Sequence, residues 1–385
     1  MIKIPISKIK KIEGSHKEWY HKTIFPKLIQ EIKEIKEINN KYQVETDNVL
    51  KRNLRKYLIF LHCLKKEEKE LGILSNEKMI KYIKQWNYFN FNYEELEVEI
   101  KKIKKQKEFS QWQKEIDKVN KNYLFYFLKI EKKDIKIKET SYLKGLQKLF
   151  DYDNFSKEKI KMWNRNKVIT KLEIDVCPYC QRNYVTSYKD NQKEKYKTTA
   201  DLDHFYLKSK YPFLALTLYN FVPSCQICNS RMKGSKDTYN TIKSSLKTIY
   251  PYSDEEFTGV FKTDGGIVLG LMDEDTNFKV KIAEIKNEKT KKTIDMFKLD
   301  KIYESAHNKY LLDMINNIKN KPIAYLENIA EFFIESNKEN EEKIREEIVW
   351  NLEKIVLEPY KFKVKNGEPL GKLTKDILEE LGIDI

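Results

Sequence analysis

The chain has 385 residues, of which 40% are apolar and 35% are charged, and its formal net charge is +15. This length allows two or three domains with cores of their own, and apolar residues spread along the whole chain argue against a disordered protein. No run of about 18 apolar residues occurs, and the first residues lack the apolar segment of a signal peptide. We therefore expect a cytoplasmic protein that does not enter a membrane.

The positive charge is concentrated in the first two thirds of the chain. Basic residues exceed acidic ones in residues 1–150 (35 against 21) and 151–250 (18 against 10), whereas acidic residues prevail in 251–385 (28 against 21). Such an excess favours a polyanionic partner, because binding to phosphates releases counterions. A lysine-rich composition is also typical of AT-rich genomes, and only six of the 74 basic residues are arginine. The charge alone therefore leaves both interpretations open.

Helices are expected between residues 15 and 150, because apolar residues recur there at spacings of three and four. The clearest stretches are 18–38, 48–71, 76–86 and 92–130. From about residue 158, cysteine, proline and asparagine replace this pattern, strands are expected within 256–283, and helical periodicity returns from 288. The sequence thus predicts a mainly helical α+β protein with a basic helical region (1–157), a central module (158–250) and a C-terminal region with a β-hairpin and helices (251–385).

Four of the five cysteines form two pairs, Cys177-Pro-Tyr-Cys180 and Cys225-Gln-Ile-Cys228. A two-residue gap lets both thiolates of a pair face one tetrahedral Zn²⁺, and paired cysteines in a reducing cytosol indicate a metal rather than disulfides. The 44 residues between the pairs exceed the spacing of a zinc ribbon, so a small domain must be inserted. Buried thiols without a metal are the alternative, and Cys63, on an apolar helix, is expected to be a small core residue.

Four polar residues lie before and after the second cysteine pair. Asp203 and His204 end a predicted strand, Asn220 lies in the connection to Cys225, and Asn229 begins a predicted helix after Cys228. Hydrolysis of a phosphodiester needs a base, which a neutral histidine supplies, and a hard cation such as Mg²⁺, which aspartate and asparagine oxygens bind. Taken alone, however, a histidine in a strand is more often a hydrogen-bonded core residue.

Further candidates surround these four. Lys233 and Arg231 lie on the helix that begins at Asn229 and would offset the charge of a phosphate. Asp201 shares a strand face with Asp203 and could assist a metal, although a solvated carboxylate is the more common interpretation. For the remaining candidate residues we expect simpler roles. Trp163 anchors a helix in the core, Arg165 and Lys167 contact backbone phosphates, His307 is structural, and His16, His21 and His62 show no ligand spacing.

The segments CPYCQRNYV, DLDHF and YNFVPSCQICNSRMKGS, within residues 175–236, resemble the HNH nuclease family, whose ββα-metal site is braced by a Cys₄ zinc knuckle. They are most similar to bacterial defence-associated members such as the Septu-type nuclease subunit, which works beside an ATPase. By position, the resemblance implies that His204 is the general base, Asp203 and Asn229 bind the catalytic metal, and Asn220 fixes the loop and orients the base. Asn229 replaces the final histidine of the family, and Leu207 replaces a common proline.

The resemblance implies a metal-dependent endonuclease with structural Zn²⁺ and catalytic Mg²⁺ or Mn²⁺, acting on nucleic acid, with DNA favoured, in anti-phage defence. The sequence contains no GxxxxGK[ST] motif, so nucleotide sensing would need a partner ATPase. Two alternatives stay open. One is an abortive-infection nuclease that cleaves RNA such as tRNA. It stays open because no feature of the sequence indicates whether the 2′-hydroxyl that distinguishes RNA from DNA is recognised. The other is a non-catalytic zinc module used for nucleic-acid binding or assembly.

Overall fold

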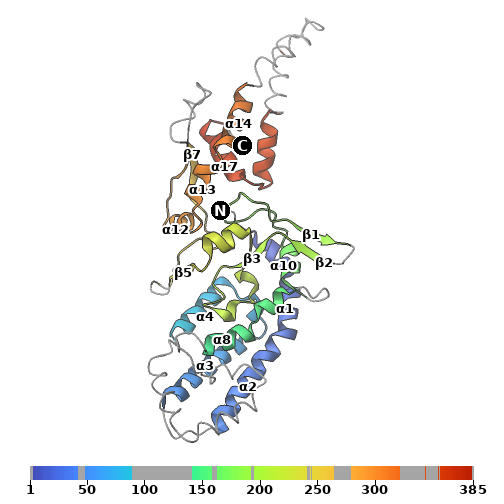
Figure 1. The fold of residues 1–385 in the computed structure, drawn as a ribbon, viewed down its shortest axis with the longest axis vertical. Helices are drawn as coiled ribbons and strands as arrows, with labels where there is room; N and C mark the ends of the chain where they lie inside the picture. The colour runs from blue at the N-terminus through green and yellow to red at the C-terminus, as the bar shows by residue number, and fades with distance from the viewer. Residues whose placement is uncertain are drawn as a thin grey trace.

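The computed structural model describes residues 3–41, 48–88, 141–157, 163–191, 195–240, 243, 245–263, 279–320, 343, 354 and 356–383. Within these residues the chain forms helices and four two-stranded antiparallel sheets, which confirms the α+β class. The molecule is elongated, with the N-terminal helices at one end, the central strands in the middle and the C-terminal helices at the other end (Figure 1). Among the described residues, no helix is both long and apolar enough to span a bilayer.

The N-terminal region is helical, as expected, and the predicted stretch 92–130 lies outside the described residues. Its elements are α1 (Ile6–Thr23), α2 (Phe25–Lys41), α3 (Asn48–Lys66), η1 (Leu71–Ile73), α4 (Asn76–Tyr88), α8 (Ser141–Leu149), α9 (Tyr152–Ser156) and α10 (Arg165–Leu172). Helix α1 begins well before residue 15, because Ile9 and Ile12 continue its buried face toward the N-terminus. The periodic stretch 18–38 is divided between α1 and α2, and Pro26 lies in the first turn of α2, where proline is tolerated.

The central module contains short strands connected by single turns of helix. Its elements are β1 (Ser187–Asp190), β2 (Lys195–Thr198), β3 (Asp201–His204), η3 (Pro212–Leu214), η4 (Leu218–Asn220), β4 (Phe221–Ser224), η5 (Ile227–Lys233), β5 (Tyr239–Asn240) and β6 (Ser245–Leu246). Strand β3 pairs with β4, with His204 opposite Phe221 and Asp201 opposite Ser224. The expected strand end at His204 and helix start near Asn229 are both observed.

The C-terminal region contains a β-hairpin followed by helices. Strands β7 (Val260–Thr263) and β8 (Val280–Ala283) pair within the predicted 256–283, and the residues between them lie outside the described ones. The helices are α12 (Glu288–Phe297), α13 (Leu299–Ala306), α14 (Asn308–Asn320) and α17 (Gly371–Glu380). Lys298 adopts a left-handed conformation (φ 51°) that ends α12 and starts α13 in a new direction.

The described buried side chains form two cores. The first unites residues of α1 through α4, the central module and α12, so it crosses the boundary at residue 158 that the sequence suggested. The second core lies between the β7–β8 hairpin and helices α13, α14 and α17. The central module therefore shares its interior with the N-terminal helices, whereas most of the C-terminal region has a core of its own.

His16 connects α1 to the central module. Its ring is fully buried, Nε2 donates to the backbone oxygen of Leu216 at 2.9 Å, and Nδ1 accepts the indole N–H of Trp163 at 2.9 Å. The bond from Trp163 requires the neutral ring, because a protonated Nδ1 cannot accept, and burial lowers the pKa of His16 from 6.5 to about 4. This histidine is structural, which agrees with its lack of ligand spacing in the sequence.

Because the folded protein resists protonation of His16, its unfolding free energy should fall with acidity. The unfolded chain takes up this proton below pH 6.5 and the folded chain only near pH 4, so the loss begins below 6.5 and reaches about 2 kcal/mol at pH 5. Urea unfolding followed by tryptophan fluorescence at pH 7 and pH 5 should show a smaller loss for His16→Gln than for the wild type. His21→Gln, at an exposed position of the same helix, is the control. Equal losses in the wild type and His16→Gln would contradict this account.

Candidate functional site

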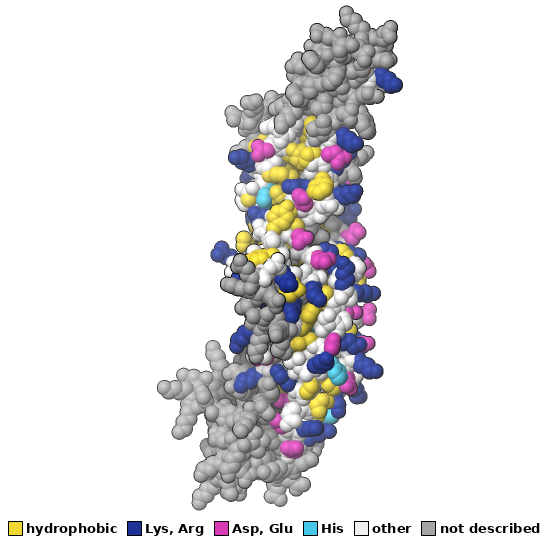
Figure 2. Space-filling view, turned by 90° about the vertical axis from the view of Figure 1, so that its right-hand side faces the viewer, with side chains coloured by type: hydrophobic (Ala, Val, Ile, Leu, Met, Phe, Trp, Pro, Cys, Tyr) yellow, Lys and Arg dark blue, Asp and Glu magenta, His cyan; other side chains and the backbone are white. Residues whose placement is uncertain are grey.

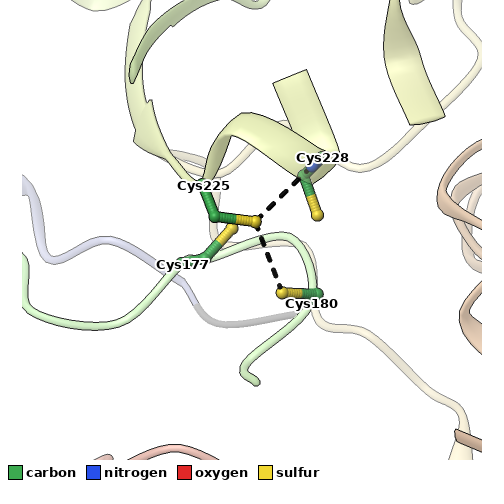
Figure 3. Close-up of side chains that lie close together, drawn as sticks. All are labelled: Cys177, Cys180, Cys225 and Cys228. Atoms are coloured by element: carbon green, nitrogen blue, oxygen red, sulfur yellow. Dashed lines mark hydrogen bonds between the residues drawn. The ribbon is translucent and has the colours of Figure 1, made fainter. Parts of the chain in front are cut away.

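The four paired cysteines converge on one point (Figure 3). Their sulfur atoms all lie within 4.8 Å of one another and all four residues are buried. The Cys180 and Cys225 sulfurs are 4.0 Å apart, close to the roughly 3.8 Å expected of thiolates around a tetrahedral zinc and far from the roughly 2.05 Å of a disulfide. The cluster can therefore bind a metal ion such as zinc, as the spacing predicted.

Backbone and side-chain amides stabilise the cysteine cluster. The Asn183 side chain donates to the Cys225 sulfur at 3.3 Å, and the backbone N–H of Cys228 donates to the same atom at 3.5 Å. Such N–H···S bonds around a thiolate orient it and stabilise its charge. Cys63, by contrast, lies on α3 and is packed against the first core, as expected for a small apolar residue.

The C-terminal region binds the backbone of the first cysteine pair. The Tyr303 hydroxyl donates to the Cys180 carbonyl at 2.6 Å, and the Leu370 N–H donates to the Gln181 carbonyl at 2.6 Å. His307 accepts the Arg182 Nε–H at 2.5 Å and lies beside the Tyr303 ring. His307 therefore has the structural role that the sequence favoured.

Asn220 is fully buried and holds the loop between β3 and β4. Its oxygen accepts the Tyr206 N–H at 2.7 Å, and its amide group donates to the carbonyls of Tyr206 and Leu214, both at 3.0 Å. These three bonds fix the loop on both sides of η3. The expected function of Asn220 in fixing this loop therefore agrees with its contacts.

The orientation of His204 depends on the same loop. Its Nε2 contacts the Ala215 carbonyl at 2.9 Å, and its ring meets the edges of Tyr152 and Phe221 at centroid distances of 4.4 Å and 5.4 Å. A carbonyl can only accept a hydrogen bond, so Nε2 carries the proton and Nδ1 carries the lone pair. Burial lowers the pKa of His204 from 6.5 to about 4, which leaves the ring neutral at pH 7.

Asp203 and Lys233 form a buried ion pair at 2.8 Å, with side-chain exposures of 4% and 1%. The other oxygen of Asp203 accepts the Tyr179 hydroxyl at 2.6 Å, and Lys233 also donates to the His204 carbonyl. The sequence assigned Asp203 to a catalytic metal and Lys233 to a phosphate; in this structure the two side chains bind each other, because η5 packs its C-terminal end over this part of β3.

Asp201, which the sequence gave as a carboxylate that could assist a metal, contacts the other end of η5. The Asn229 side-chain amide donates to one Asp201 oxygen at 2.9 Å, and the Arg165 guanidinium lies 3.5 Å from the other. Asn229 and Lys233 are four residues apart on η5 and each contacts one carboxylate of β3. Asp201 and Asn229 therefore form a half-buried carboxylate–carboxamide pair.

A cavity of about 410 Å³ lies along β3. Its polar and aromatic lining includes Tyr152, Arg165, Asp201, His204, Lys208 and Asn229. Of the predicted site residues, His204 and Asn229 thus share the cavity, whereas Asp203, Asn220 and Lys233 do not line it. The sequence did not indicate Tyr152 or Lys208 as site residues. The one available clue was the position of Lys208, four residues after His204.

Metal content tests the cysteine cluster. We expect the purified wild type to contain one equivalent of zinc by mass spectrometry, and Cys225→Ser to lose it and to unfold at lower urea concentration, because a structural metal contributes directly to folding. Cys63→Ser should keep its zinc, since Cys63 lies outside the cluster. A wild-type protein that folds normally after exhaustive chelation, with no metal bound, would contradict the assignment.

Comparisons with known proteins do not identify a family. A scan against protein-family models found no match, and neither the curated proteins nor the solved structures contain a protein that matches this chain. The resemblance to HNH nucleases therefore depends on the motif residues of the sequence.

Proposed function

We propose that the protein is a metal-dependent HNH-type endonuclease that hydrolyses phosphodiester bonds in nucleic acid. The observation that carries this proposal is the cavity beside β3, where a neutral imidazole, a carboxylate–carboxamide pair and two cationic side chains line one space. The order of elements supports it too, because the antiparallel pair β3–β4 leads directly into the helix η5, as a ββα-metal module requires.

His204 is the proposed general base. Its proton is held on Nε2 by the Ala215 carbonyl, which leaves Nδ1 to take a proton from the attacking water. The lowered pKa keeps this nitrogen unprotonated at neutral pH. The loop held by Asn220 positions the carbonyl and thereby the ring, so Asn220 is a positioning residue.

Asp201 and Asn229 are the residues that fit a divalent cation. Mg²⁺ prefers oxygen ligands and is commonly bound by one or two carboxylates together with the phosphates of the substrate. The Asn229 nitrogen already bonds to Asp201, so the Asn229 oxygen is available to a cation. When bound, Mg²⁺ or Mn²⁺ would polarise the phosphate and lower the pKa of a coordinated water.

Arg165 and Lys208 take over the function that the sequence gave to Lys233. Arg165 is bonded to the Ala200 carbonyl at 2.5 Å, which points its guanidinium along the edge of β3. Lys208 lies 4.5 Å from the centre of the Tyr152 ring and 3.1 Å from Asp153. Both cations line the cavity, where they would offset the charge of a bound phosphate.

The biological setting that we propose is a cytoplasmic effector of bacterial anti-phage defence, with DNA as the favoured substrate and an ATPase as a partner. This part of the proposal is supported by the motif resemblance and by the basic character of residues 1–250. RNA such as tRNA is the competing substrate, since either backbone suits the same base and cation.

His204→Ala should lower the rate of cleavage by about 10²–10⁴-fold, because the variant lacks the base. The measurement is gel analysis of plasmid DNA, single-stranded DNA and total tRNA after incubation with the full-length protein in Mg²⁺, Mn²⁺ or EDTA. His21→Ala, at an exposed position of α1, is the control with unchanged activity. The substrate cleaved decides between DNA and RNA, and a wild-type protein that binds these nucleic acids but cleaves none would support the non-catalytic zinc module instead.

Asp201→Asn and Asp203→Asn should impair different properties, the first cation binding and the second stability. Asp201→Asn weakens cation binding, so the Mg²⁺ concentration for half-maximal activity should rise about tenfold or more, with little change in the unfolding free energy. Asp203→Asn removes the partner of a buried lysine and should cost about 3–5 kcal/mol of stability. Urea unfolding and Mg²⁺ titration of activity separate the two effects. If Asp203→Asn alone changed the Mg²⁺ requirement, Asp203 would be the ligand.

A further inference from the structure

The β1–β2 hairpin projects from the molecule beside β3 and α10 (Figure 1). Two exposed aromatic residues lie here: Tyr188 on β1, and Tyr184 three residues before β1, where it pairs with Val176; their exposed fractions are 53% and 59%. These values are unusual in this chain, because most of the other described tyrosines are buried or half-buried. The rings are therefore not used in either core.

The two tyrosines lie on the same side of the extended chain. Exposure alternates from Tyr184 through the buried Val185 to the exposed Thr186, and again to Tyr188. Four residues of extended chain place the two rings about 13 Å apart. Two separate aromatic faces are thus offered to solvent.

Lysines lie on both faces of the hairpin. Lys197 stands directly opposite Tyr188, on the same face, and lies 3.9 Å from Asp190, whereas the exposed Lys189, next to Tyr188 in β1, points to the other face. The neighbouring α10 adds Lys167 and Lys171. On the face toward which the hairpin projects, hydrophobic side chains are interspersed with lysine and arginine (Figure 2). Aromatic faces among cations are the elements that bind unpaired nucleotides, with bases stacked on the rings and phosphates on the lysines.

The hairpin leads directly into the cavity. Strand β2 ends at Thr198, and Asp201 follows three residues later as the first residue of β3. From Lys197 to Asp201 the chain can span at most about 14 Å. Arg165, which lines the cavity, begins α10, and the Asn166 side chain donates to the Tyr196 carbonyl of β2 at 3.0 Å. The hairpin therefore lies next to the elements that line the cavity.

We infer that the β1–β2 hairpin binds unpaired nucleotides of the substrate, with bases stacked on Tyr184 and Tyr188, next to the phosphate in the cavity. This inference rests on the proposed function and narrows it to nucleic acid that contains single-stranded segments. A duplex keeps its bases in its own stack and offers only its backbone phosphates to the lysines.

Binding is tested in the full-length His204→Ala background without added Mg²⁺ or Mn²⁺ and without a chelator, which would remove the zinc, by fluorescence anisotropy of labelled oligonucleotides, so that cleavage is not required. Tyr188→Ala and Tyr184→Ala should each weaken binding of a single-stranded oligonucleotide by at least about fivefold, which is the low end of the effect of a base–aromatic stack. Tyr188→Phe keeps the ring and should keep the affinity. Phe362→Ala, at an equally exposed aromatic position in the C-terminal region, is the matched control with unchanged affinity.

The duplex of the same sequence provides the second comparison. Its affinity should change less than twofold in the tyrosine variants, whereas Lys197→Gln should weaken binding of both ligands and reduce the salt dependence of each. Unchanged single-strand affinity in both alanine variants, or an equal loss on duplex and single strand, would overturn the inference. If the alanine variants lose single-strand affinity as expected but the wild type cleaves no substrate, the proposed nuclease activity is wrong and the inferred binding surface is still supported.

Discussion

The geometry of the central module depends on the cysteine cluster. Burial raises the pKa of the Cys177 thiol, and four sulfurs within 4.8 Å of one another cannot carry several negative charges in a buried place without a cation between them. A metal bound here would close the chain from Cys177 to Cys228 into one unit that contains the hairpin, β3, the loop and β4. The same knuckle backbone binds Tyr303 and Leu370, so one ion would support both the module and the attachment of the C-terminal region.

A second constraint is formed by three successive carbonyl groups at the C-terminal end of η3. Leu214 accepts from Asn220, Ala215 accepts from His204, and Leu216 accepts from His16. The loop, the proposed base and helix α1 are therefore fixed by adjacent residues of one segment. A displacement of α1 would move the carbonyl that sets the tautomer and orientation of His204. This explains why the N-terminal helices share a core with the module rather than forming a separate domain.

Features encoded by nearby residues were predictable from the sequence. The cysteine spacing predicted the cluster, and the polar residues at the ends of short segments located His204 at a strand end and Asn229 at a helix start. Which of Asp201 and Asp203 would bond to Asn229 was not predictable, because both lie on one strand face. The register of η5 sets these contacts: it places Asn229 over one carboxylate and Lys233 over the other. Contacts such as His16 to Leu216, 200 residues apart, leave no local pattern at all.

The cavity also depends on residues outside the motif. Among the described residues, β3 pairs with β4 alone, and its other edge is covered by the side chains of α9 and α10. The Tyr152 hydroxyl donates to the Leu202 carbonyl at 3.4 Å, and Arg165 donates to the Ala200 carbonyl. An uncovered strand edge exposes unsatisfied backbone groups and promotes pairing with other chains. The same two side chains form one wall of the cavity, so the protection of this edge and the placement of a cation beside Asp201 are achieved by a single packing arrangement. The segment 175–236 alone would lack both the covered strand edge and the cation beside Asp201. The chemistry proposed for it therefore requires the helices that precede it.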